Sequence, residues 1–267
     1  MSIFLTPFIT IYVCVLAFIL GAVFASFLGC FAYRICKGES IAKGRSHCDE
    51  CGHELKLFDL IPIVSYLARR GRCKYCGKKI SPGCLWGEVV LALLFVVCTL
   101  KFDLTPYLVL ALFFICILYM ITLTDLQDRI IPNRCVIAAI VVRIIYFFLT
   151  GEGTLKAFLW LLAKGFIVSV PVLLLTLLME AILKKEALGG GDIKLLFVLG
   201  IYLGLGNCLL MLLVACILGI IGAAITMSKW SEEGSIAIPF GPYLAAGSVV
   251  ALLFGDSIIT WYLSLFL

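Results

Sequence analysis

Hydrophobic residues fill most of the chain in long runs, and polar residues gather in a few segments between them. A helix needs about 20 predominantly apolar residues to cross a bilayer. The second and sixth runs are short, so the count of spans is about eight. The pattern therefore predicts an all-α polytopic membrane protein. The expected spans are residues 7–31, 85–101, 104–124, 132–149, 158–183, 193–206, 207–228 and 238–264.

The composition leads to the same fold class. The 267 residues are 63% hydrophobic and 14% charged, with a mean hydropathy of +1.17. Soluble domains carry about 25% charged and roughly 45–50% apolar residues, so this apolar excess is too large for one core. It excludes a secreted, a disordered or a soluble protein and makes the lipid bilayer the expected surroundings. A net charge of +5 could suggest a nucleic-acid partner in a soluble protein. In this chain the placement of the basic residues matters more than their sum, and no nucleic-acid partner is expected.

The basic residues predict how the chain lies in the membrane. The polar stretch 34–79 holds eleven of the 21 lysines and arginines, and basic loops stay on the cytoplasmic side. No basic residue precedes the first apolar run and no small-residue cleavage site follows it, so this run is expected to remain as a span. Three parts are expected. They are a first span at 1–33, a cytoplasmic cysteine loop domain at 34–84 and a membrane core of about seven spans at 85–267.

Four of the thirteen cysteines form a pattern in the cytoplasmic loop. Cys48, Cys51, Cys73 and Cys76 are spaced as C-x2-C-x21-C-x2-C, and a glycine follows each pair. Two such turns predict a tetrahedral zinc site with four thiolate ligands, structural because no coordination position stays open. A reducing cytosol favours bound metal over disulfides. The alternatives are a redox dithiol, unliganded thiols, or a flanking histidine in place of one thiol.

Two aspartates lie next to apolar spans at the same predicted membrane face. Asp125 ends the third span, and Asp192 begins the sixth after three consecutive glycines, Gly189 to Gly191. The glycines permit backbone angles closed to other residues and the close approach of a substrate chain. They also leave Asp192 near a helix N-terminus, which favours a carboxylate. Two carboxyls that share a proton can activate a water and protonate a leaving amine, which suits peptide hydrolysis.

Simpler roles exist for each carboxylate. Asp125 could pair with Arg129, four residues further on, or cap a helix. Asp192 could be an ordinary N-cap after a glycine turn. Asp128 competes with Asp125 for the catalytic role.

Four sequence segments together resemble the type IV prepilin peptidase family, bacterial intramembrane aspartyl proteases of the GxGD kind. They are the D-L-x4-I-P segment at 125–132, the G-G-G-D-I-K-L segment at 189–195, the double CxxC loop with D-L-I-P-I-V-S-Y-L at 59–67, and I-P-F-G-P-Y-L-A at 238–245. The resemblance implies that Asp125, not Asp128, and Asp192 are catalytic. It also implies an active-site loop of Gly189, Gly190, Gly191 and Lys194. Gly29, Cys36 and Cys84-Leu85 depart from the family pattern but do not involve the aspartates.

The resemblance also implies a substrate and a location. The expected partners are pilin or pseudopilin precursors of type IV pili, type II secretion or competence. Their basic leader would be cut at the cytoplasmic face of the bacterial inner membrane. Many members of the family also methylate the new N-terminus with S-adenosylmethionine. The chain has no G-x-G-x-x-G nucleotide fingerprint, so the sequence itself does not support this second activity. A methyl-transfer site is to be sought at Glu88 and the cysteine loop.

Two other classes of protein have sequence features in their favour. A transporter would also carry carboxylates in its bundle, but nearer the membrane midplane and with broken helices in corresponding halves. A non-catalytic assembly factor would use the zinc loop for docking, and replacing its aspartates would leave processing intact.

Overall fold

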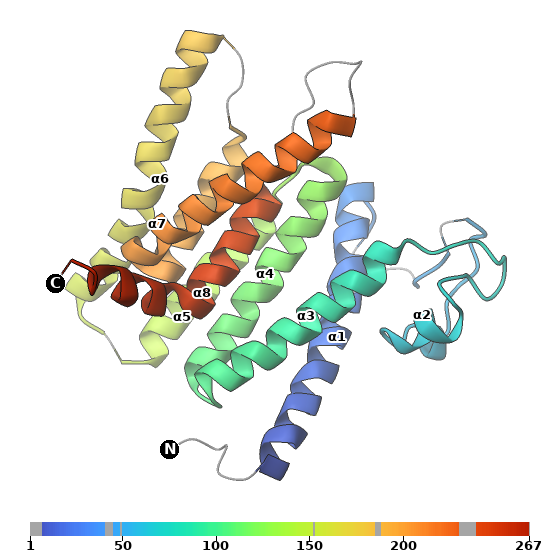
Figure 1. Ribbon diagram of the computed structural model, residues 1–267. Coiled ribbons are helices and arrows are strands. Elements are labelled where there is room, and N and C mark those ends of the chain that lie inside the picture. Colours follow the sequence, from blue (N-terminus) through green and yellow to red (C-terminus); the bar gives the residue numbers. More distant parts are fainter. Residues whose placement is uncertain are drawn as a thin grey trace. The chain divides into compact units, whose positions relative to one another are not determined.

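A computed structural model describes residues 7–40, 45–48, 50–151, 153–184, 188–229 and 239–266 (Figure 1). Within these ranges the regular structure is helical apart from two isolated β-bridges, which confirms the predicted fold class. The elements are α1 (Pro7–Lys37), the 3-10 helix η1 (Leu57–Asp59), α2 (Val64–Ala68), α3 (Pro82–Phe102), α4 (Pro106–Asp128), α5 (Asn133–Leu149), α6 (Leu155–Leu183), α7 (Gly190–Lys229) and α8 (Gly241–Leu263).

Six of the described helices are long and apolar enough to cross a membrane, against about eight spans expected. They are α1, α3, α4, α6, α7 and α8. The fourth expected span corresponds to α5, which has 17 residues and is shorter than the others. The sixth and seventh expected spans both lie in α7. Gly204 interrupts α7 with φ 76° and ψ 175°, a backbone region that only glycine adopts readily, so α7 consists of two helical segments joined at a kink.

Local sequence explains where several helices begin and end. Pro82 opens α3, and the Ser81 hydroxyl accepts the N–H of Gly83 at 3.3 Å. Thr154 caps α6 in the same way, with its hydroxyl 3.3 Å from the N–H of Ala157. These side chains satisfy backbone donors that the first helical turn leaves without partners. Lys184 ends α6 in the left-handed conformation.

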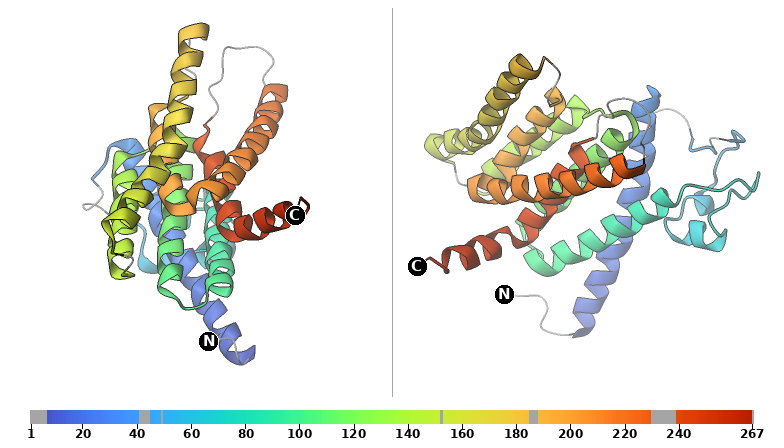
Figure 2. Two further views of the ribbon diagram at one scale, coloured as in Figure 1. Left: turned by 90° about the vertical axis from the view of Figure 1, so that its left-hand side faces the viewer. Right: turned by 45° about the horizontal axis from the view of Figure 1, so that its top comes forward.

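The chain forms two compact units, Met1–Leu123 and Thr124–Leu267. In the first unit α1 and α3 pack closely, as two views show (Figures 1 and 2). A Cβ on Gly21 would lie 2.7 Å from the Cα of Ala92, so only a small residue fits there, as is common where helices meet in membranes. The cysteine loop connects these two helices.

The second unit repeats this use of small residues. A Cβ on Gly200 of α7 would lie 2.8 Å from the Cα of Gly165 of α6. A Cβ on Gly247 of α8 would lie 2.5 Å from the carbonyl oxygen of Met211 of α7. Because both crossings have no room for a side chain, α6, α7 and α8 form one packed group in which α7 contacts both of the others.

Candidate active site and metal centre

Asp125 is a buried carboxyl at the C-terminal end of α4. Asp125 is 5% exposed, and its Oδ2 accepts a hydrogen bond from the backbone N–H of Gly241 at 2.8 Å. Gly241 is the first residue of α8 and precedes Pro242. A Cβ at Gly241 would lie 2.7 Å from the same oxygen. The start of α8 therefore fits closely against the Asp125 carboxyl.

Asp192 lies in the first turn of α7, which confirms its predicted place near a helix N-terminus. The residue is 9% exposed. Its backbone N–H donates to the carbonyl of Gly189 at 3.0 Å, and the backbone of Gly189 also hydrogen-bonds its carboxyl. Its Oδ1 is buried and has no hydrogen-bond partner in the part of the chain that the structure describes. One oxygen of this carboxyl is therefore left without a hydrogen bond from the described residues.

The second unit brings the two carboxyls near one another, close enough for their charges to interact. Asp128, by contrast, is exposed at the end of α4. Among the described residues Asp125 forms no ion pair with Arg129, and the ion pairs that do occur involve other side chains. This arrangement favours a pair of Asp125 and Asp192 over the surface roles that their sequence neighbours suggested. The catalytic role of the pair remains a prediction.

The three glycines before Asp192 do not have unusual backbone angles. None of them has a positive φ, so the structure does not use the backbone freedom that these glycines permit. Space matters instead at two of the positions. A Cβ on Gly191 would lie 3.1 Å from the Cβ of Ile131, and one on Gly189 would lie 3.3 Å from Asp192 Oδ2. Gly190 faces open space.

Lys194 connects the two aspartate-bearing segments. Its exposed Nζ donates to Asn133 Oδ1 at 3.1 Å. Asn133 opens α5 directly after Pro132, the proline that closes the Asp125 segment. Lys194 therefore holds the start of α7 to the start of α5. Among the described residues it forms no ion pair with either carboxyl.

Gly241 is a site residue to which the sequence alone assigned no role. Its segment stood out only as typical of the family. The sequence signal that could have identified Gly241 is its position directly before Pro242 at the start of a span. The preceding residues 231–238 lie outside the described part of the chain.

The four predicted cysteine ligands form one cluster in the loop between α1 and α3. Their Sγ atoms all lie within 4.8 Å of one another, and Cys48 Sγ lies 4.0 Å from Cys76 Sγ. Four thiolates at about 2.3 Å from a tetrahedral zinc would be about 3.8 Å apart. No other group of potential metal ligands occurs among the described residues. The donor set and its spacing therefore fit zinc.

The two halves of the cluster have the same backbone pattern. Cys48 N–H donates to His53 O and Gly52 N–H to Cys48 O, at 3.0 and 2.8 Å. In the second half, Cys73 N–H donates to Lys78 O and Gly77 N–H to Cys73 O, at 2.8 and 3.0 Å. Gly52 and Gly77 both have a positive φ, of 66° and 73°, as such a tight turn requires. Each CxxC-Gly segment is thus a turn that presents two thiols to one point, as predicted.

The thiols cannot all ionise easily without a cation. Backbone N–H groups of Cys76 and Tyr75 lower the pKa of Cys73 to about 7. The N–H of Lys78 lowers the pKa of Cys76, but burial and the neighbouring cysteines outweigh it and raise this pKa to about 11. A divalent cation removes that conflict, because metal ligands must be deprotonated and the bound charge stabilises thiolates.

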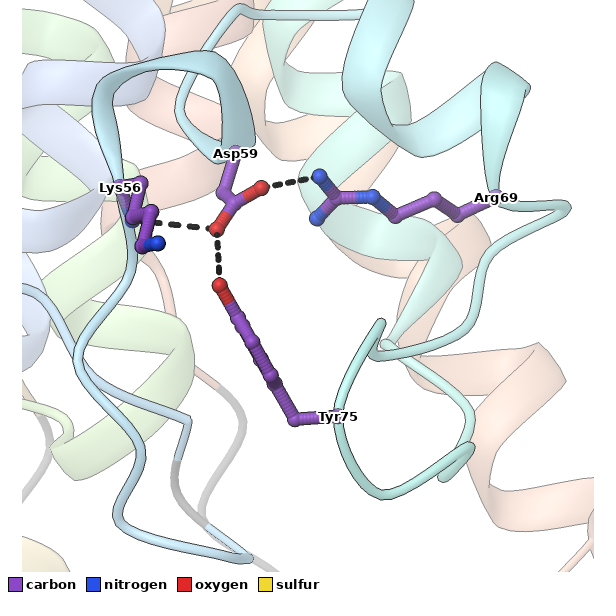
Figure 3. Close-up of polar contacts among 4 residues, drawn as sticks. All are labelled: Lys56, Asp59, Arg69 and Tyr75. Carbon is purple, nitrogen blue, oxygen red and sulfur yellow. Dashed lines mark hydrogen bonds and ion pairs between the residues drawn. The ribbon is translucent and has the colours of Figure 1, made fainter.

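A buried carboxylate supports the second cysteine pair (Figure 3). Asp59, 8% exposed, accepts the N–H of Lys56 and the hydroxyl of Tyr75, both at 3.0 Å, and forms an ion pair with Arg69. Tyr75 stands between Cys73 and Cys76. Asp59 therefore holds the linker between the cysteine pairs against the metal-binding turn.

The two flanking histidines are not needed as ligands. The ring of His53 packs against that of Tyr75, with centroids 3.6 Å apart. The Nδ1 of His47 lies 3.4 Å from the carbonyl of Arg45. Both residues are exposed, and the four sulfurs complete a tetrahedral set without them.

Comparison with known proteins gives the same family for both parts of the chain. Residues 19–102 match the family model described as the bacterial Peptidase A24 N-terminal domain, and residues 112–224 match that of the type IV leader peptidase family. No solved structure matches the chain significantly.

Similar curated proteins carry one shared name, prepilin leader peptidase/N-methyltransferase. That of Bacillus subtilis (strain 168) is 34% identical over 248 residues, which are 93% of this chain and 97% of the relative. That of Aeromonas salmonicida (strain A449) is 33% identical, covering 82% of this chain and 75% of the relative. That of Aeromonas hydrophila is 32% identical over 84% of this chain and 76% of the relative. The chain therefore belongs to the type IV leader peptidase family and is a peptidase.

Proposed function

We propose that this protein is an aspartyl endopeptidase that removes the basic leader from type IV pilin-like precursors, with Asp125 and Asp192 as its catalytic pair. The observation that carries the proposal is the meeting of two buried carboxyls from two helix ends in a multi-pass membrane protein of a peptidase family. The names of the relatives supply the substrate class.

The chemistry follows from two neighbouring carboxyls that hold one proton between them. The ionised carboxyl takes a proton from a water, whose oxygen attacks the scissile carbonyl carbon. The protonated carboxyl gives its proton to the amide nitrogen as the C–N bond breaks. The Gly241 N–H fixes Asp125 Oδ2, and the unpartnered Asp192 Oδ1 is the oxygen available to the water.

The proposed location is the cytoplasmic face of the bacterial inner membrane. Support comes from the eleven basic residues at 34–79, which retain this loop inside the cell. With α5 counted as a span, as the sequence analysis expects, alternation places Asp125 and Asp192 on the same side. A pilin or pseudopilin precursor with its leader in the cytoplasm would present the cleavage point at this boundary.

The cysteine cluster is proposed to hold a structural zinc ion. Cys48, Cys51, Cys73 and Cys76 would be its ligands, and the ion would supply a rigid crosslink between the two turns, with no position left for a reacting water. A loop of this size has little core of its own, so bound metal would provide much of its folding free energy.

A second activity is proposed from the relatives' names, which include N-methyltransferase. The amine that cleavage exposes would be methylated, with S-adenosylmethionine as the methyl donor.

The test is cleavage of a purified pilin-type precursor by the full chain in lipid nanodiscs. Asp125→Asn and Asp192→Asn keep the side-chain volume and remove the acid–base function, so each should lower the cleavage rate by about 10²–10⁴-fold. Asp128→Asn is the matched control, because Asp128 is on the same helix and exposed. It should cleave at the wild-type rate.

Two results would contradict the proposal. Cleavage near the wild-type rate by either variant of the pair would show that the aspartates are not the catalytic groups. Failure of the folded wild-type protein to cut any pilin-type precursor would favour the transporter or the assembly factor.

A further inference from the structure

The segment between the two cysteine pairs is polar on its inner side and apolar on its outer side. Asp59 is buried against Arg69, Tyr75 and the backbone N–H of Lys56 (Figure 3). Phe58, its neighbour in the sequence, is 81% exposed. A domain that folds in water has the opposite arrangement, because water favours exposed charges and buried rings. The outer side of this segment is therefore not built for contact with water.

The short helix α2 has the same inverted arrangement. Val64 and Leu67 are 59% and 60% exposed, and they share one face because they are three positions apart. Ser65 and Tyr66 instead line a cavity that the loop forms with α1 and α3. Ile61 is also exposed, and its carbonyl accepts the N–H of Ser65, so it continues the helical turn. We call the exposed side chains of Phe58, Ile61, Val64 and Leu67 the apolar face of the loop.

Two hydrogen bonds place this segment beside α1 and α3, not beyond their ends (Figures 1 and 2). The N–H of Ile63 donates to Glu88 Oε2 at 2.7 Å, and the side chain of Ser26 hydrogen-bonds the same carboxyl. Glu88 follows Pro82, the start of α3, by six residues, and Ser26 precedes Lys37, the end of α1, by eleven. At 1.5 Å per residue these positions are about 9 Å and about 16 Å inside the helix ends. Both belong to spans expected from the sequence, so the segment folds back to the depth of the membrane boundary.

Basic residues flank the apolar face. Lys56 stands just before it in the sequence and Arg70 just after it. Both are exposed, and neither takes part in the ion pairs of the described residues. Asp59, the one acidic residue between them, is already paired with Arg69. The outside of the segment therefore combines apolar side chains with positive charge, which is the combination that binds an anionic lipid surface.

We propose that the apolar face lies in the lipid interface of the membrane, with acyl chains against its side chains and anionic phospholipid headgroups on Lys56 and Arg70. In the orientation proposed above this is the inner leaflet. The loop is joined at both ends to helices long and apolar enough to cross that membrane, α1 and α3, so the lipid surface is within reach. Docking holds the cysteine turns at the boundary. The proposal goes beyond the peptidase activity, because both aspartates belong to the other unit.

A protein is the rival occupant of the apolar face, since exposed apolar patches also mark protein interfaces. The candidates are the second unit, a second copy of the chain and a pilin-type precursor. The basic leader of a precursor is poorly suited to the face, because Lys56 and Arg70 repel like charge. The test must therefore tell lipid from protein.

The first experiment identifies what touches the apolar face. The photoreactive residue benzoylphenylalanine replaces Phe58, Val64 or Leu67, one at a time, in the full chain in nanodiscs of phosphatidylethanolamine and phosphatidylglycerol. After irradiation, mass spectrometry separates lipid adducts from cross-links to protein. We expect about fivefold more lipid adduct, or a greater excess, at these positions than at Glu54. Glu54 is the matched control, because it is exposed in the same loop and pairs with Arg45 outside the apolar face.

The second experiment tests whether lipid holds the segment in place. Phe58→Ser with Leu67→Ser removes side chains that the loop itself leaves exposed. In nanodiscs the backbone N–H groups of residues 61–68 should then exchange with deuterium about tenfold faster or more, because lipid no longer buries these side chains. Residues 72–80 should exchange at the wild-type rate, which shows that the second cysteine turn remains folded.

The charge on the segment has its own test. Lys56→Gln with Arg70→Gln should speed exchange of residues 61–68 by about fivefold or more in nanodiscs that contain phosphatidylglycerol. The same variant should match the wild type in nanodiscs of phosphatidylcholine alone, because that surface has no net charge to attract the basic residues. Glu54→Gln should change exchange in neither lipid.

Three results would overturn the proposal. They are lipid adducts no more abundant at the apolar face than at Glu54, cross-links from the face mainly to residues 124–267, a second copy or a precursor, and unchanged exchange in Phe58→Ser with Leu67→Ser. Precursor cleavage by the same wild-type samples tests the peptidase separately. Cleavage without lipid adducts removes the docking face and leaves the peptidase, and lipid adducts without cleavage leave the docking face and remove the peptidase.

Discussion

Replacing Gly241 by alanine should impair the peptidase without unfolding it. A Cβ at this position would lie 2.7 Å from Asp125 Oδ2 and 3.2 Å from its Cγ, whereas ordinary contacts of a Cβ begin at 3.4 Å. The carboxyl must therefore move by roughly 0.7 Å. That movement also lengthens the 2.8 Å hydrogen bond from the Gly241 N–H.

The magnitude follows from the displacement. A misplacement of about 1 Å costs on the order of 10²-fold in rate, so we expect kcat to fall by about 10- to 100-fold. Overpacking costs about 1–3 kcal/mol of stability, and alanine in place of glycine in a helix returns up to about 1 kcal/mol. Gly241 has no positive φ, so its backbone accepts alanine. The net loss is small beside a typical stability of about 5–15 kcal/mol.

Two control variants separate position from stability. Gly29→Ala in α1 adds a Cβ with no atom within 4 Å, so it should leave cleavage unchanged. Gly247→Ala lies on the same helix as Gly241, and its Cβ would meet the Met211 carbonyl at 2.5 Å. It should lower the melting temperature while leaving the rate per folded molecule unchanged. The assay is single-turnover cleavage of a precursor, normalised to folded protein.

The reasoning fails if Gly241→Ala cleaves within about threefold of the wild-type rate. It also fails if Gly247→Ala loses as much activity per folded molecule, because packing of α8 in general would then explain the loss.

Three further outcomes test the loop and the kink. Asp59→Asn should release zinc more readily in a chelator competition, because it removes the charge that anchors the second cysteine turn, while Glu54→Gln should match the wild type. The Lys56 N–H and the Arg69 guanidinium lower the pKa of Asp59 to about 2. A lowered pKa stabilises the fold above about pH 4 and loses that contribution as the pH falls through about 2. The stability difference between wild type and Asp59→Asn should therefore stay constant from about pH 5 to 8, and a difference that titrates there would contradict this origin. Gly204→Ala should lower the melting temperature, at a cost of about 1–3 kcal/mol, and an unchanged melting temperature would show that the kink is not strained.

Much of the architecture could be predicted from local patterns. Long apolar runs are stable when a membrane surrounds them, and a run of about 20 residues is long enough to cross it as a helix. Such runs therefore indicate the positions of the helices directly. The C-x2-C spacing with a following glycine encodes a turn by local backbone geometry, and both turns have the predicted form. The departures arose where neighbouring spans had no polar boundary, as in α7, where one glycine makes the break.

The candidate site was only partly predictable. Asp125 and Asp192 stood out because carboxylates next to apolar spans are costly. The role of Gly241 was not predictable, since it depends on a hydrogen bond between residues that are far apart in the sequence. The glycines before Asp192 permit both unusual backbone angles and a close approach, and a sequence does not tell which of the two a fold uses; here none has a positive φ and two have close neighbours.

The sequence by itself thus determined the membrane class, the family, the metal-binding turns and the two aspartates, since each depends on residue type and short spacing. Only the tertiary structure decided which carboxyls are buried and that the N–H of Gly241 holds Asp125. The physical reason is that burial and pairing depend on which distant segments come within a few ångströms, and periodicity carries no information about those distances.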